Sequence, residues 1–160
     1  PQAPGTIIST ELTPRKIEAV AAKDNITAIK IKSGRMLLAH GFLSKVFECF
    51  AKHKTAIDMV TTSEVGVSVT IDNTKHLDEI VNELKTFGTV TVEQDMVIVC
   101  VVGDMNTENV GFQAKIVNAL KEIPIRMISY GGSNYNVSFL IQANNKQRAL
   151  NALSQNLFNE

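Results

Sequence analysis

Hydrophobic and polar positions follow two different periods in the first half of this chain. Residues 26–32 alternate at every second position, which is the pattern of a strand with one buried face. From Gly41 onward, apolar residues recur every three or four positions with charged residues opposite them, which predicts an amphipathic helix. The helix is expected to end near Lys52 and Lys54, because cations suit the negative end of the helix dipole.

The same two periods predict the rest of a βαββαβ unit. Asp72, Asn73 and Thr74 carry oxygens that could cap a second helix. The elements expected after the first helix are strands at 56–61 and 66–71, a helix with apolar residues Leu77, Ile80, Val81 and Leu84, and a closing strand at 90–93. This order is typical of an antiparallel four-stranded sheet with two helices on one face, which is an α+β, ferredoxin-like fold.

A second unit of the same kind follows, and it is one strand short. The elements expected in it are a strand at 96–102, a helix from about Gly111, strands at 125–130 and 136–141, and a helix from Asn145. An open sheet edge leaves backbone groups unpaired, so we expect a strand from elsewhere to complete this sheet. The N-terminal segment offers residues 6–9 and 17–22, and we prefer 17–22 because it is longer. The first unit is then inserted, in sequence, inside the second.

The two units differ at one position that matters for chemistry. Both begin their first helix with Gly-Phe, at Gly41 and at Gly111. The strand after this helix carries Asp58 in the first unit, whereas the matching strand of the second unit carries Arg126. This difference in charge predicts that only one of the two units binds a ligand.

Composition and charge exclude several classes of protein. Basic and acidic residues number 16 each, so the chain lacks the basic footprint of a nucleic-acid binder. An RNA-recognition module also needs aromatic residues on its central strands, where only Phe139 is available. Apolar runs are far shorter than the roughly 20 residues that span a bilayer, and the N-terminus lacks the pattern of a signal peptide. We therefore expect a cytoplasmic protein without nucleic-acid or membrane partners.

The sequence shows no arrangement typical of catalysis or of metal binding. Cys49 and Cys100 lie in apolar patterns without a CxxC spacing, which predicts reduced core thiols. His40, His53 and His76 are scattered, and we expect surface or helix-end roles for them. The GxSxG, HExxH and GxxxxGK[ST] motifs do not occur. We therefore predict no catalytic residue, no metal site and no cofactor in this chain.

Several segments resemble the paired ACT domains at the C-terminus of aspartokinase, and they are most similar to the lysine-sensitive type. The segments that carry the resemblance are Met36-Leu37-Leu38, Gly41-Phe42-Leu43, Val46-Phe47, Ile57-Asp58, Thr61-Thr62-Ser63-Glu64-Val65, Ile125-Arg126-Met127-Ile128-Ser129-Tyr130-Gly131 and Ser154-Gln155-Asn156-Leu157-Phe158. The resemblance covers nearly everything from about Pro4 onward, and the kinase domain of that family is absent.

The resemblance implies an organisation and a function. Residues 27–94 would form a first, ligand-binding ACT domain, residues 16–23 plus 95–160 a second one, and residues 1–15 a linker from the kinase domain. L-lysine would bind as an allosteric effector and inhibit aspartate phosphorylation, while ATP and Mg²⁺ would belong to the absent kinase domain. Two chains would form a homodimer through the first ACT domain.

Simple chemistry suggests how such a site would hold lysine. The unpaired N–H groups of the helix start at Gly41-Phe42-Leu43 suit a carboxylate, and Gly41 lets the ligand approach the backbone. Asp58 could bind the α-ammonium and Glu64 the side-chain ammonium. The full predicted set of ligand-binding residues is Met36, Ala39, Gly41, Phe42, Leu43, Ile57, Asp58, Ser63 and Glu64. Ala39 stands where lysine-sensitive relatives often have Ser, so a hydroxyl contact would be missing.

Plainer interpretations remain open at this point. Phe42 or Leu43 could be a core residue, Asp58 could face solvent on an alternating strand, and Glu64 could be a solvated turn residue. At the level of function, the alternatives are a structural ACT dimerisation module without a ligand and a threonine-binding regulatory region.

Overall fold

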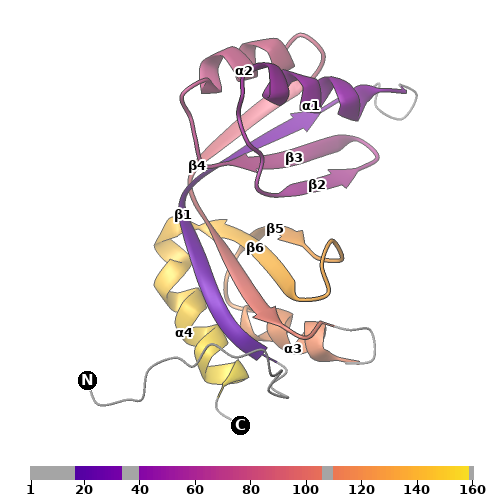
Figure 1. Ribbon diagram of the computed structural model, residues 1–160. Helices are drawn as coiled ribbons and strands as arrows, with labels where there is room; N and C mark the ends of the chain where they lie inside the picture. Colours follow the sequence, from indigo (N-terminus) through magenta and orange to yellow (C-terminus); the bar gives the residue numbers. More distant parts are fainter. Residues whose placement is uncertain (1–16, 34–39, 106–109, 159–160) are drawn as a thin grey trace.

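A computed structural model describes residues 17–33, 40–105 and 110–158 of the chain (Figure 1). These residues form β1 (Ile17–Lys32), α1 (Phe42–Lys52), β2 (Val60–Ser63), β3 (Gly66–Ile71), α2 (Leu77–Leu84), β4 (Thr89–Gly103), α3 (Phe112–Ala119), β5 (Ile125–Ser129), β6 (Asn136–Gln142), the short 3-10 turn η2 (Ala143–Asn145) and α4 (Lys146–Leu157). The predicted α+β fold of two ferredoxin-like units is confirmed.

The strands form one antiparallel sheet in the order β2-β3-β1-β4-β6-β5. The segment 17–22 pairs with the second half of β4, as the strand shortage predicted, so the first unit is inserted into the second. The structure corrects one expectation. Segments 17–22 and 26–32 were expected to be separate strands, and they are two halves of β1; segments 90–93 and 96–102 are likewise two halves of β4.

Two residues with positive φ explain why these long strands bend. Asn25 in β1 has φ 58° and Asp95 in β4 has φ 56°. Asn and Asp accept this left-handed conformation more readily than most residues, so the chain turns without leaving the sheet. The register between β1 and β4 shifts around the bend, between Lys23 and Ala28.

The bend divides the molecule into two lobes, and β1 and β4 run through both (Figure 1). The first lobe consists of α1, α2, β2 and β3 with the second half of β1 and the first half of β4. The second lobe consists of α3, α4, β5 and β6 with the other halves of β1 and β4. Each lobe carries its helices on one face of its part of the sheet.

Each lobe has its own apolar core between helices and sheet. The core of the first lobe consists of Ile29, Ile31, Phe42, Val46, Cys49, Phe50, Val67, Val69, Ile71, Ile80 and Leu84. The core of the second lobe consists of Ile17, Val97, Val99, Val101, Met105, Phe112, Ile116, Leu120, Ile123, Val137, Phe139, Ile141, Ala149, Leu153 and Leu157. The two sets follow the insertion of the first unit into the second, since Ile17 of β1 belongs to the core of the second lobe and Ile29 and Ile31 to that of the first.

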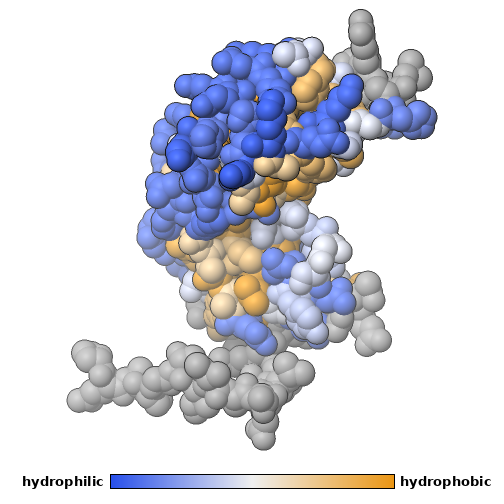
Figure 2. Space-filling model, turned by 45° about the horizontal axis from the view of Figure 1, so that its top comes forward, coloured by the Kyte–Doolittle hydropathy of each residue, from blue (hydrophilic) through white to orange (hydrophobic). Residues whose placement is uncertain are grey.

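A third apolar cluster lies where the two lobes meet, on the face of the sheet opposite the helices. Its members are Ile26, Ala28, Met59, Met96, Ile98, Met127 and Leu140. Figure 2 shows apolar surface gathered between the largely hydrophilic outer faces of the lobes. Methionine side chains adapt to irregular gaps, which suits a contact between two curved surfaces.

Two local predictions for the first lobe are wrong. The strand expected at 56–61 begins at Val60, although Asp58 N–H already donates to the carbonyl of Thr70. Residues 72–74 do not cap α2, because His76 occupies the N-cap position and makes no side-chain cap bond. Asn73 instead accepts a hydrogen bond from the backbone N–H of Lys75 and closes a tight turn. In the described part of the chain, no helix is long and apolar enough to cross a membrane.

Candidate functional site

The start of α1 has the geometry expected of a carboxylate site. Gly41, at the N-cap, has φ 84° and ψ 7°, and a Cβ added to it would meet no atom within 4 Å. The left-handed φ explains the glycine, and the first N–H groups of a helix have no partner within the helix, which suits a carboxylate. Gly111 at the start of α3 has the same conformation, with φ 83°. The helix start therefore does not distinguish the two lobes.

The residues that follow Gly41 divide between core and surface. Phe42 is 7% exposed and packs edge-to-face on Phe87, with ring centroids 6.0 Å apart. Leu43 is 36% exposed. Ile57 is half-buried against the core of the first lobe. Phe42 is thus primarily a core residue, and Leu43 is the one that a ligand could reach.

The β2–β3 turn lies at the same end of the lobe as the start of α1. The turn contains Glu64, which is exposed, and Ser63 Oγ donates to the carbonyl of Gly66 at 3.4 Å. The carbonyl of Val65 accepts from the N–H of Ser33, which connects the turn to the end of β1. The predicted residues Met36 and Ala39 lie outside the described residues.

Asp58 lies at the opposite end of the first lobe. It follows α1 by six residues and precedes β2. Since α1 has 11 residues, its start is about 16 Å from its end. Figure 1 shows the trace from α1 to β2 descending on the side away from the β2–β3 turn. One chain therefore does not bring Asp58 together with Gly41 and Glu64.

Asp58 binds an ammonium group within its own chain. Lys23 Nζ lies 2.5 Å from Asp58 Oδ1 and 2.8 Å from Asp72 Oδ2. The hydrogen bonds to Asp58 and then Asp72 raise the pKa of Lys23, and the same lysine lowers the pKa of Asp72. Sequence analysis missed both partners. Asp72 was interpreted as a helix cap, and Lys23 falls between the strands predicted at 17–22 and 26–32, although it lies within β1.

Arg126 of the second lobe forms an equivalent ion pair with the charges exchanged, and its partner Glu93 lies in the first half of β4. Arg126 Nε donates to Glu93 Oε2 at 2.8 Å, and Nη2 also contacts the Glu93 carboxylate. The strand pairing shows which positions of the two units are equivalent. Equivalent positions are 70 residues apart in β1 and β4 and in β3 and β6, and 68 residues apart in β2 and β5. By these spacings Lys23 corresponds to Glu93, and Asp58 corresponds to Arg126. Only the first lobe therefore presents a carboxylate at this position.

We expect Glu93→Gln to remove a stabilising interaction that depends on pH. Arg126 lowers the pKa of Glu93, so the pair stabilises the fold above the unfolded value of about 4.3 and is lost as the pH falls through the folded value. Because the Arg126 side chain is 40% exposed, the loss should be about 0.5 kcal/mol at neutral pH.

Urea unfolding at neutral pH and at about pH 3 measures this effect. The difference between wild type and Glu93→Gln should vanish at the lower pH. The exposed Glu122→Gln is the matched control and should leave the unfolding free energy unchanged at neutral pH. A difference at Glu93 that persists at low pH would contradict the assignment.

A shallow hollow of about 250 Å³ lies beside the β2–β3 turn, on the sheet face opposite the helices. Lys30 and Lys32 line it together with Thr61, Ser63 and Ser68. Two lysine side chains favour an anion there, and they would oppose an ammonium group. Of the predicted ligand-binding residues that the structure describes, only Ser63 lines this hollow.

Comparison with known proteins places the chain in a class. A family model described as an ACT domain matches residues 99–157. Lysine-sensitive aspartokinase 3 of Escherichia coli is 31% identical over 167 residues, which cover 99% of this chain and 37% of that protein. The aspartokinase of Schizosaccharomyces pombe is 35% identical over 155 residues, covering 94% of this chain and 30% of its own length. The chain thus spans about a third of the length of the curated relatives it matches.

Solved structures agree with the sequence relatives. A chain from Porphyromonas gingivalis W83, assigned as a C-terminal regulatory domain of aspartate kinase, is 58% identical with a TM-score of 0.82, covering 90% of this chain and 99% of that one. E. coli aspartokinase III in complex with lysine and aspartate is 32% identical with a TM-score of 0.83, covering 93% of this chain and 35% of that one. Fold and matches define a regulatory module built of ACT domains. The chain belongs to the aspartokinase regulatory domains.

Proposed function

We propose that this chain is the lysine-sensing regulatory region of an aspartokinase. L-lysine binds at the first lobe and lowers aspartate phosphorylation by a kinase domain of the parent protein, where ATP and Mg²⁺ are used. A relative that is lysine-sensitive by name and a similar structure in complex with lysine support this choice of effector. The chain itself carries no catalysis in this proposal.

The observation that carries the proposal is the Lys23 ammonium held between Asp58 and Asp72. In this contact two carboxylates of the chain bind the alkylammonium group of a lysine side chain. A free lysine ligand would need the same kind of contact. The Lys23 side chain is 47% exposed, so its ammonium can leave for solvent at small cost. The equivalent arginine in the second lobe cannot bind an ammonium.

The positions of the predicted residues favour a site shared by two chains. Gly41 and Glu64 lie at one end of the first lobe and Asp58 at the other, and α1 between them is about 16 Å long. Two copies related by a two-fold axis through this lobe would place Asp58 of one copy beside Gly41 and Glu64 of its partner. Leu43, Phe47 and Val65 are 36–49% exposed on this lobe and offer apolar surface for such a homodimer.

In this arrangement each group of the ligand meets a complementary group. The N–H groups after Gly41 bind the α-carboxylate, Asp58 of the other copy binds the α-ammonium, and Glu64 binds the side-chain ammonium. Leu43 and Ile57 flank the aliphatic stem. Because the site closes only when two chains meet, bound lysine stabilises one geometry of the dimer. Lysine would transmit inhibition by binding this geometry more tightly than another geometry of the dimer.

Calorimetric titration of the chain with L-lysine and with L-threonine tests the proposal. Saturable heat with lysine, together with weaker or no heat with threonine, is the expected result. Tighter binding of threonine would identify the other effector, and no heat with either amino acid would leave a structural dimerisation module without a ligand.

Glu64→Gln should separate the two effectors further. Lysine has a second ammonium group and threonine does not, so neutralising Glu64 should weaken lysine binding by about 5-fold and leave any threonine binding unchanged. The same titrations measure both affinities. Equal losses for the two amino acids would remove Glu64 from the contact with the lysine side chain. The exposed Glu48→Gln on α1 is a suitable control.

A further inference from the structure

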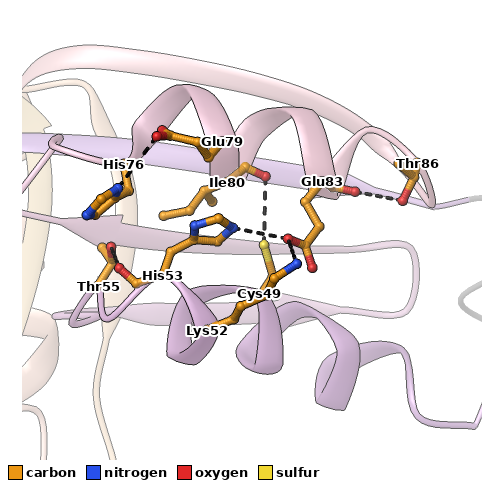
Figure 3. A network of polar contacts seen from close by, with 9 residues as sticks. All are labelled: Cys49, Lys52, His53, Thr55, His76, Glu79, Ile80, Glu83 and Thr86. Carbon is orange, nitrogen blue, oxygen red and sulfur yellow. Dashed lines mark hydrogen bonds and ion pairs between the residues drawn. The ribbon is translucent and has the colours of Figure 1, made fainter.

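The outer layer of the first lobe contains a cluster of metal-binding side chains that the lysine site does not use. Cys49 and His53 come from α1 and its C-terminus, and Glu83 comes from α2 (Figure 3). Their donor atoms all lie within 4.8 Å of one another. Although the sequence analysis treated the histidines as scattered, the fold brings the rings of His53 and His76 to 6.2 Å between centroids.

We propose that Cys49, His53 and Glu83 bind a transition-metal ion of the Zn²⁺ type, which clamps α1 to α2. The donor set of one thiolate, one imidazole and one carboxylate is one that zinc accepts, and a water molecule completes the tetrahedron. The proposal rests on this geometry and is independent of the proposed lysine function.

The local geometry fits such an ion. Cys49 and His53 are four residues apart, so they face the same side of α1 and its last turn. His53 Nε2 lies 3.0 Å from Glu83 Oε2, which is close to the separation of two ligands that each lie about 2.0–2.2 Å from zinc. Figure 3 shows all three side chains directed into the space between the two helices.

Cys49 gives the cluster a chemistry that an ordinary ion pair between helices lacks. The thiol is 1% exposed, and its hydrogen bond to the carbonyl of Ile80 is long, at 3.8 Å. Burial raises the pKa of Cys49 to about 11, so without a metal it stays a thiol. A bound metal ion stabilises the thiolate, and the thiol proton leaves to solvent.

Lys52 is the group that the metal displaces. Its Nζ lies 2.9 Å from the same Glu83 Oε2 that contacts His53, and its side chain is 66% exposed. Moving this ammonium into water costs little. Lys52 and His53 lower the pKa of Glu83, so the carboxylate is ionised and ready to coordinate at neutral pH.

Co²⁺ and Zn²⁺ titration of the reduced, chelator-treated chain tests the site. We expect a single Co²⁺ per chain with a thiolate-to-cobalt charge-transfer band, and Zn²⁺ should abolish the band. Cys49→Ala should abolish the band, and His53→Gln and Glu83→Gln should weaken Zn²⁺ binding by more than about 100-fold, since even second-shell partners are worth 10- to 100-fold.

The chain offers matched controls, because Cys100 is half-buried in the second lobe and His40 is exposed just before α1. Cys100→Ala and His40→Gln should bind both metals like wild type. If Cys49→Ala failed to fold, the variants at the half-buried His53 and Glu83 would still decide the question. Absence of the band in wild type, or its loss in Cys100→Ala and retention in Cys49→Ala, would overturn the proposal in favour of a simple ion pair between helices.

Discussion

Asp58→Ala is expected to weaken L-lysine binding by about 30-fold or more, since removing one partner of a hydrogen-bonded charge pair costs roughly 2–5 kcal/mol. The fold should be unaffected, because Asp58 precedes β2 and its backbone bond to Thr70 does not need the side chain. Calorimetry measures the affinity, and circular dichroism checks the fold. Asp24→Ala is the matched control, because this exposed acid binds Lys146 near the bend and lies outside the predicted site. Unchanged lysine affinity in Asp58→Ala would remove Asp58 from the site.

The ion pair between Lys23 and Asp58 provides a second test, in which a substitution should raise the lysine affinity. If Lys23 competes with the ligand for Asp58, Lys23→Met should raise lysine affinity. An exposed pair is worth roughly 0.5–1 kcal/mol, so the increase should be about 2- to 5-fold. A loss of affinity in Lys23→Met would show that Lys23 supports the site instead of competing for it.

Phe139→Ala is expected to cost about 3–5 kcal/mol of unfolding free energy, because Phe139 is fully buried in the core of the second lobe. Since β1 and β4 run through both lobes, we expect the two lobes to unfold together. The unfolding free energy of the first lobe should therefore fall by the same amount. Urea unfolding reports the whole chain, and thiol labelling of Cys49 in a Cys100→Ala background reports the first lobe.

Ile128→Ala provides the control for this prediction. Ile128 pairs with Phe139 across β5 and β6 but is 43% exposed, so its truncation should cost less than about 1 kcal/mol. We expect faster labelling of Cys49 in Phe139→Ala. The free energy of opening calculated from the labelling rate should fall by the same amount as the free energy of unfolding measured in urea. Unchanged protection of Cys49 would mean that the two lobes unfold independently.

Periodicity predicted most elements of the fold because each lobe buries one face of its strands and one stripe of its helices. It also predicted the insertion, because a sheet that lacks a strand must take one from elsewhere. The continuity of β1 and β4 was missed because Asn25 and Asp95 resemble loop residues. Both adopt a left-handed φ inside a strand, and the sequence pattern does not reveal this.

The site was predicted only in part. The contrast between Asp58 and Arg126 depends on matching strands in a repeat, and the structure places the two at equivalent positions. The contacts of Asp58 and Asp72 with Lys23 form because the bent strand β1 runs past the end of the first lobe. No local sequence pattern predicts this path of the strand. The separation of Gly41 from Asp58 likewise follows from the direction of α1 across the sheet.

A crystal structure of this chain grown with saturating L-lysine tests the central claim most directly. The account predicts lysine between two copies of the first lobe, with its carboxylate at the N–H groups after Gly41 of one copy and an ammonium group on Asp58 of the other. Lys23 should then have left Asp58. Lysine bound beside Arg126 in the second lobe, or no bound lysine at saturating concentration, would contradict the account.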